Sequence, residues 1–200
     1  MGCSTEVLHL IGCINQLRQQ RSGESSGRSS QRSTPSNYEN DEIFFQIEDR
    51  LLHLEQELHI QPGLTSGLIN ERRITLTAEL YRIGAALYFY QVATASFIPA
   101  INVHDLVRSG LDILWEMEIC SSPWPLFILA CSVTDDEDRI RILDLMEMSG
   151  SSRRIGNYSI IIGLVKAVWK RQDLMVNDKA RRGVDWRDLV QEGGYMPSFI

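Results

Sequence analysis

Apolar residues recur along most of this chain at intervals of three and four, which is the spacing of one face of an α-helix. One stretch departs from that rule, because residues 126–131 carry no charged side chain on any face. A helix without a polar face has to be enclosed on all sides. Ser122 is a suitable N-cap, and Pro123 and Pro125 fit the first turn, where a missing amide hydrogen costs little. The pattern therefore predicts a buried central helix that begins after Ser122.

The remaining apolar stripes predict amphipathic helices on both sides of this central one. Thr75 and Asn102 are the expected caps of two of them, and Thr134 with Glu137 has the spacing of a capping box. No segment alternates with period two for long enough to predict a strand. The fold class is therefore all-α, a compact bundle or array of about six to eight helices. The expected helices cover residues 5–20, 40–58, 75–98, 102–120, 122–131, 134–149 and 152–171, with a short helical turn in the tail.

Two of these stripes carry further expectations. The seam of residues Phe44, Ile47, Leu51, Leu54 and Leu58 covers only about two heptads, which is short for a coiled coil. We expect it to dock on the rest of the protein rather than to form a dimer zipper. In the helix that follows Thr134, the periodic face is expected at Ile140, Leu143 and Met146 or Glu147.

Between the first two helices the composition changes to Ser, Gly, Arg and Gln. Such a segment cannot bury enough apolar area to offset its chain entropy, so we expect a flexible linker. Its arginines, Arg21, Arg28 and Arg32, leave a DNA-contacting or phosphorylation-regulated loop as the alternative. The expected organisation is an N-terminal helix at 1–20 packed on the domain, a flexible linker at 21–38 and a helical domain at 39–200.

The charge and the cysteine content of the chain indicate which kinds of partner and which cellular compartment to expect. The formal net charge of −6 works against avid binding to phosphate backbones, which usually needs a basic face. The cysteines Cys3, Cys13, Cys120 and Cys131 include no Cys-x-x-Cys pair, which favours reduced thiols in an intracellular protein. The stretch 83–100 is interrupted by polar residues and predicts a core helix rather than a membrane span.

No arrangement of residues predicts catalysis. The chain has no Gly-x-Ser-x-Gly, no Gly-rich phosphate loop and no His-Glu-x-x-His, and its histidines are scattered. The acidic run 135–138 lacks the turn glycine and spaced oxygens of a calcium loop, so we interpret it as charge matched to a helix dipole. We expect no catalytic residue, no metal ligand and no enzyme activity. The four tryptophans are expected to be packing anchors, with a ligand pocket among them as the alternative.

Several short motifs, taken together, resemble the fungal-specific transcription factor domain, the helical regulatory region of binuclear zinc-cluster regulators. The motifs are Leu76-Thr77-Ala78-Glu79-Leu80-Tyr81-Arg82, Val107 with Gly110-Leu111-Asp112, Ser122-Pro123-Trp124-Pro125-Leu126-Phe127-Ile128, Thr134-Asp135-Asp136-Glu137-Asp138-Arg139, Val168-Trp169, Asp185-Trp186-Arg187 and Pro197-Ser198-Phe199-Ile200. We take as structural signature residues Ser122, Pro123, Trp124, Pro125, Leu126, Phe127, Asp135, Glu137, Trp169 and Trp186.

The resemblance implies a regulatory domain that acts in the nucleus. Regulators of this kind bind DNA through six cysteines that hold two zinc ions, and the four cysteines here lie too far apart for that module. The resemblance therefore implies no cofactor in this chain, with zinc expected only in an absent N-terminal cluster, and no direct contact with DNA or a membrane. The implied partners are proteins of the transcription machinery or a zinc-cluster partner, and a small-molecule inducer and a homodimer stay open. The alternative function is a helical scaffold or small-ligand-binding protein without a transcriptional role.

Overall fold

The structure, a computed structural model, describes residues 4–26, 37–56, 68–93, 98, 100–117, 120, 122–153, 158–175 and 184–193. Within these ranges the secondary structure is helical and no strand occurs, which confirms the all-α prediction. None of the helices found there is long and apolar enough to cross a bilayer. The helices are α1 (Thr5–Ser26), α2 (Asn37–His53), α3 (Leu68–Val92), α4 (Val103–Met117), α5 (Pro123–Ser132), α6 (Asp136–Arg153), α7 (Tyr158–Leu174) and α8 (Trp186–Gly193).

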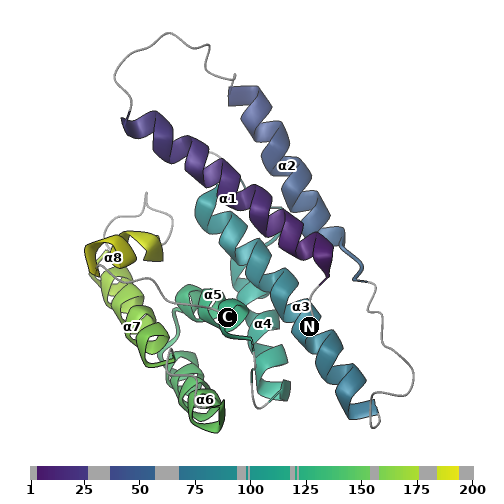
Figure 1. The fold of residues 1–200 in the computed structure, drawn as a ribbon, viewed down its shortest axis with the longest axis vertical. Helices are drawn as coiled ribbons and strands as arrows, with labels where there is room; N and C mark the ends of the chain where they lie inside the picture. Colours follow the sequence, from purple (N-terminus) through teal and green to yellow (C-terminus); the bar gives the residue numbers. More distant parts are fainter. Residues whose placement is uncertain are drawn as a thin grey trace.

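Two groups of helices meet at α5 (Figure 1). On one side α3 packs against α1 and α2, and on the other α7 packs against α6 and α8. The short helix α5 contacts α3 and α4 on one side and α7 on the other. The predicted central helix is therefore the element that joins the two groups.

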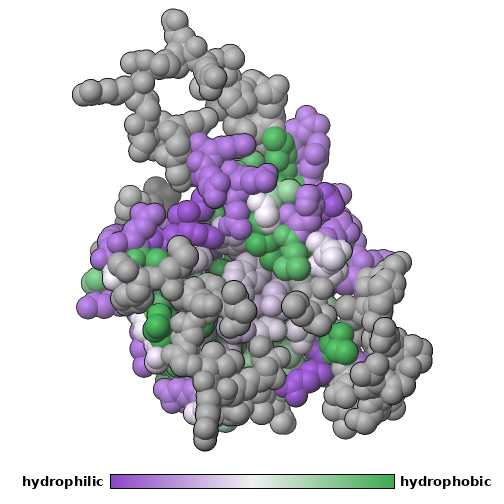
Figure 2. Space-filling model, viewed as in Figure 1, coloured by the Kyte–Doolittle hydropathy of each residue, from purple (hydrophilic) through white to green (hydrophobic). Residues whose placement is uncertain are grey.

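The apolar seam of α2 is docked on the protein, as expected. Phe44, Ile47 and Leu51 are buried, and the Phe44 ring lies 5.8 Å from that of Phe89 on α3. Leu58 lies outside the described residues. Hydrophobic side chains also reach the surface over α1 and α2, among many hydrophilic ones (Figure 2). The seam residues Phe44, Ile47 and Leu51 are thus buried within the chain, so they cannot also form a coiled-coil dimer.

Several predicted helix boundaries were wrong. The first helix, whose amide at Val7 donates to the Ser4 hydroxyl at 3.3 Å, runs to residue 26 instead of 20. The third begins at residue 68, seven residues before Thr75, whose hydroxyl donates to the Glu71 carbonyl inside the helix at 3.1 Å. Thr75 satisfies its hydroxyl within the helix and so does not start it. Residues 27–36 are outside the described ranges, and the predicted linker at 21–38 stays a prediction.

The predicted face of α6 was correct at Met146 and wrong at Ile140 and Leu143. Ile142, Leu145 and Met146 are buried, whereas Ile140 is 61% exposed and Leu143 only partly covered. The helix carries two apolar stripes, and periodicity alone cannot tell which of them meets the core. The helix also continues to residue 153 instead of stopping at 149–151, and α7 begins at residue 158 instead of 152.

Two glycines let neighbouring helices approach α5 closely. A Cβ atom on Gly84 of α3 would lie 3.2 Å from the Cα atom of Pro125. A Cβ atom on Gly110 of α4 would lie 2.9 Å from Cδ1 of Leu129. Any larger residue would push α3 or α4 away from the central helix, because the interior is close-packed.

Candidate functional site

The central helix is enclosed on nearly every side, as its uncharged sequence predicts. Leu126 and Phe127 are 0% exposed, and Pro123 and Pro125 are buried as well. Ser122 occupies the N-cap position with extended backbone angles, but its hydroxyl makes no capping hydrogen bond. Pro125, the third residue of the helix, has no amide hydrogen to donate to such a hydroxyl, and Pro123 removes another first-turn donor, so α5 begins with less need of a side-chain cap.

On the side of α5 that faces α3, Trp124 packs against two tyrosines. Its ring stacks on Tyr81 at a centroid distance of 6.0 Å and meets the edge of Tyr88 at 6.2 Å. Trp124 is only partly buried, unlike the other residues of α5's first turn. Aromatic pairs of this geometry stabilise a contact beyond their area burial.

On the opposite side, two further signature tryptophans close over α5. The indole N–H of Trp169 donates to the Ala130 carbonyl at 2.8 Å. The ring of Trp186 meets Phe127 edge-on at 5.1 Å. Signature residues from α5, α7 and α8 therefore converge on one buried cluster, as expected of packing anchors.

The acidic run after α5 forms the start of α6. The Asp135 carboxylate accepts hydrogen bonds from the amides of Glu137 at 3.0 Å and Asp138 at 3.2 Å. Asp135 is therefore the N-cap, and the prediction that Thr134 caps this helix was wrong. The Asp135 side chain serves two amides of the first turn, which leaves no need for the reciprocal Thr134–Glu137 pair.

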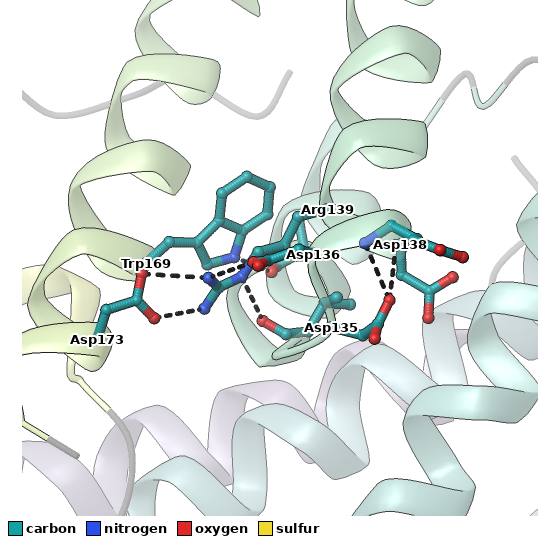
Figure 3. A network of polar contacts seen from close by, with 9 residues as sticks. Asp135, Asp136, Asp138, Arg139, Trp169 and Asp173 are labelled. Atoms are coloured by element: carbon teal, nitrogen blue, oxygen red, sulfur yellow. Dashed lines mark hydrogen bonds and ion pairs between the residues drawn. The ribbon is translucent and has the colours of Figure 1, made fainter.

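Arg139 fastens this junction to α7 (Figure 3). Its guanidinium donates to the Val133 carbonyl at 3.3 Å and to the carboxylates of Asp136 at 3.3 Å and Asp173 at 3.0 Å. It also lies 5.2 Å above the Trp169 ring, and its side chain is only 11% exposed. One planar cation thus links the α5–α6 turn to α7, a task suited to the fork geometry of arginine.

A second polar cluster attaches the C-terminal helix to α1. Arg18 donates to the Asp185 carboxylate at 2.9 and 3.1 Å, although 167 positions separate the two residues. Arg187 lies 4.5 Å over the ring of Tyr88 and donates to its hydroxyl, which in turn donates to Asn15 at 2.6 Å. Burial raises the pKa of Tyr88 and lowers that of Arg187. The Asp185-Trp186-Arg187 motif therefore has a structural role, in which it attaches the start of α8 to α1, α3 and α5.

A polar cleft lies between α4 and the start of α6. Its volume is about 360 Å³. Both signs of charge face it, with Arg108 from α4 and Arg141, Glu137 and Asp138 from α6. Its size falls in the range of small-molecule sites, but those are mostly apolar. The cleft is the feature that best matches the small ligand left open by the sequence.

No nucleophile or metal-binding group stands out in the described part of the chain. The Cys131 thiol is buried, and burial raises its pKa, so it stays protonated at neutral pH and is a poor nucleophile. A search of the described residues finds no group of three or more His, Cys, Asp or Glu side chains able to hold a metal ion.

The buried thiol leads to a prediction about alkaline stability. Above about pH 9, the ordinary pKa of a thiol, the unfolded chain loses this proton while the folded chain keeps it. The unfolded state then binds fewer protons, so the free energy of unfolding falls as the pH rises. We expect Cys131 to account for a loss of about 1 kcal/mol between pH 9 and 10. Tyr88 and Tyr90 act in the same direction above pH 10.0, since burial raises their pKa values too.

Urea unfolding at pH 8, 9 and 10 measures this effect. The control is Cys131→Ala, which shifts stability at every pH but should flatten the decline between pH 9 and 10. Equal slopes for the two proteins would show that the thiol ionises as easily in the folded state as in the unfolded one.

Sequence reasoning missed the roles of three residues that hold the structure together. Arg139 ends one of the motifs quoted above and Glu48 stands beside the Phe44 seam, but nothing in the sequence indicates which groups their side chains bind. Glu48 is only 3% exposed and accepts hydrogen bonds from Tyr90 and from the Ala100 amide, both at 2.7 Å. Gly84 could have been found, because an isolated glycine in a helical pattern often marks a close approach of two backbones. Of the motifs quoted above, residues 197–200 lie outside the described residues.

Comparison with known proteins gives two findings. A family model described as the fungal specific transcription factor domain matches residues 1–200. Transcription factor iacI of Pestalotiopsis fici is 22% identical over 99 residues, which are 50% of this chain and 26% of that protein. The chain thus spans about a quarter of the length of that relative. No solved structure matches the chain.

Proposed function

The chain belongs to the fungal specific transcription factor domain family, and from this premise we propose that it regulates transcription as a helical effector domain. In this role it binds other proteins in the nucleus, either parts of the transcription machinery or a zinc-cluster partner. The observation that carries the proposal is the family match, which extends over residues 1–200. The similarity to a transcription factor supports it over half of the chain.

We propose that the domain acts without catalysis and without touching DNA itself. The buried, protonated Cys131 thiol supports the first point. The net charge of −6 supports the second, because a DNA-binding surface gains most of its affinity from basic residues that displace counterions. Any zinc belongs to a DNA-binding module outside this domain. Under this proposal the domain influences a promoter only when another module or partner brings it there.

A reporter experiment tests this role. Residues 1–200 fused to a heterologous DNA-binding domain should change expression from a promoter that carries the matching sites in a fungal host. The same chain without the fused module should leave that promoter unchanged. A well-expressed nuclear fusion that stays silent under every tested nutrient would contradict the proposal.

The cleft between α4 and α6 favours the alternative of a helical protein that binds a small ligand and has no transcriptional role. Its charged lining suits a polar molecule with both acidic and basic groups. Two results distinguish the functions. The alternative predicts that the reporter fusion is silent and that pull-down experiments recover a stable cytosolic partner. An inducer bound in this cleft would instead make reporter output depend on a nutrient, and Arg108→Ala should remove that dependence.

A further inference from the structure

Two apolar residues of α6 that are not buried in the core, Ile140 and Leu143, line a groove between α6 and α7. The groove has a volume of about 670 Å³. Ile140 at its edge is 61% exposed and Leu174 is 77% exposed. Its lining residues are Asp136, Arg139, Ile140 and Leu143 from α6, and Lys166, Trp169, Lys170, Asp173 and Leu174 from α7. Two helices thus expose a shared apolar strip that no other described helix covers, and such strips often mark interaction sites.

The groove has the form that accepts a helix. Its α6 wall is built from positions 136, 139, 140 and 143, and its α7 wall from 166, 169, 170, 173 and 174. Each set recurs at intervals of three and four, so each wall is one continuous helix face. Leu143 is the further apolar side chain of the lining, and the largely buried Trp169 borders the groove with Arg139 over its ring. An amphipathic helix lays its apolar face into a groove of this kind.

The charges around the groove indicate which helix it accepts. Arg139 is paired with both Asp136 and Asp173, so these three side chains together keep one negative charge (Figure 3). Lys166 and Lys170 are exposed and form no ion pair with the described residues. The groove is thus lined by three cationic side chains against two carboxylates, and its net charge is positive by one on a chain whose net charge is −6. Charge complementarity of this kind selects partners and speeds their encounter.

We propose that the α6–α7 groove is a docking site for an acidic amphipathic helix of a partner protein. Apolar residues of that helix cover Ile140, Leu143 and Leu174, and its carboxylates face Lys166 and Lys170. The proposal rests on the regulatory function above, in which the domain acts through protein partners, and it names the surface and the chemistry of one such partner. The groove explains why α6 carries a second apolar stripe that the core does not use.

A pair of designed peptides tests the docking site on the full chain. The probe is a fluorescein-labelled helix of about 18 residues, or five turns, with leucines on one face and glutamates on its flanks. Its counterpart has lysine in place of every glutamate. By fluorescence anisotropy the acidic probe should bind at least about tenfold more tightly than the basic one, and added salt should reduce the difference.

Two double variants locate the site. The charge reversal Lys166→Glu with Lys170→Glu should invert the preference, so that the basic probe binds more tightly than the acidic one. Ile140→Ser with Leu174→Ser should weaken the acidic probe at least about tenfold, because both residues would lie under it. The matched control is Met148→Ser with Ile160→Ser, one exposed residue from each of the same helices outside the groove. This control should bind the acidic probe as the natural chain does.

Other outcomes overturn the proposal. These are no binding of the acidic probe by a chain with a normal helical circular dichroism spectrum, equal loss in the control variant, or unchanged preference after charge reversal. Self-association of the chain that Ile140→Ser abolishes would assign the groove to a second copy instead. The function and the groove fail separately: an active reporter fusion without peptide binding rejects only the groove, and a silent fusion of a peptide-binding chain rejects only the transcriptional role.

Discussion

Phe127→Ala is expected to lower the free energy of unfolding by about 3–5 kcal/mol, a large part of the stability of an ordinary domain. The side chain is 0% exposed and its ring meets Trp186 at 5.1 Å. Removing it leaves a cavity that the surroundings can fill only poorly, because α5 is held by α3 and α4 on one side and by α7 on the other. The substitution also takes away the surface on which the C-terminal helix rests.

Urea or thermal unfolding measures this loss. A change of this size corresponds to a fall in Tm of roughly 10 °C for a chain of this length. The matched control is Leu174→Ala, which removes a similar apolar side chain that is 77% exposed and should change stability by no more than about 0.5 kcal/mol. A loss below about 1 kcal/mol for Phe127→Ala would mean that α5 is not the enclosed hub described here.

The burial of the central helix could be predicted from the sequence because its composition is compatible only with an enclosed position. Residues 126–131 lack any charged side chain, and only enclosure satisfies such a helix. The docking of the Phe44 seam could be predicted as well, since it is too short to form a stable zipper. In both cases the evidence is local to one stretch of chain, and no knowledge of the neighbouring elements is needed.

The register of α6 could not be predicted in the same way. Ile140 and Ile142 both begin apolar stripes with helical spacing, and only the position of α7 and the core decides between them. The pairing of Arg18 with Asp185 is equally invisible, because nothing in either segment refers to the other. The α6–α7 groove depends on the register of α6 and on how α6 and α7 are placed against each other. Neither can be read from a sequence pattern, so the groove could not be predicted.

The signature residues show the same division. Trp169 and Trp186 could be identified as packing anchors from their residue type, and both are buried against α5. The capping role of Asp135 rather than Thr134 depends on where α6 begins, which sequence patterns place only to within a few residues. Sequence reasoning thus finds residues that matter for packing more readily than it finds their partners.

Glu48 offers the second large effect, and a double-mutant cycle can isolate its cause. Glu48→Leu is expected to cost about 2–4 kcal/mol, because it leaves the buried Tyr90 hydroxyl and the Ala100 amide without their shared acceptor. Tyr90→Phe alone removes one donor and should cost about 1–2 kcal/mol. Tyr90 is only 6% exposed, so water cannot readily replace the lost carboxylate.

The double variant Glu48→Leu with Tyr90→Phe should be less destabilised than the sum of the two, by about 1–2 kcal/mol, because no buried hydroxyl is then left unsatisfied. Glu48→Gln is the matched control, since its amide oxygen can still accept both hydrogen bonds, and it should cost less than Glu48→Leu. Equilibrium urea unfolding of all four variants beside the natural chain gives the coupling energy. If the losses simply add to within about 0.5 kcal/mol, the Glu48–Tyr90 bond is not what holds α2 to α3. A coupling of the expected size would instead identify one buried carboxylate as a polar link between these two helices, beside the hydrogen bond from Arg82 to the Leu51 carbonyl.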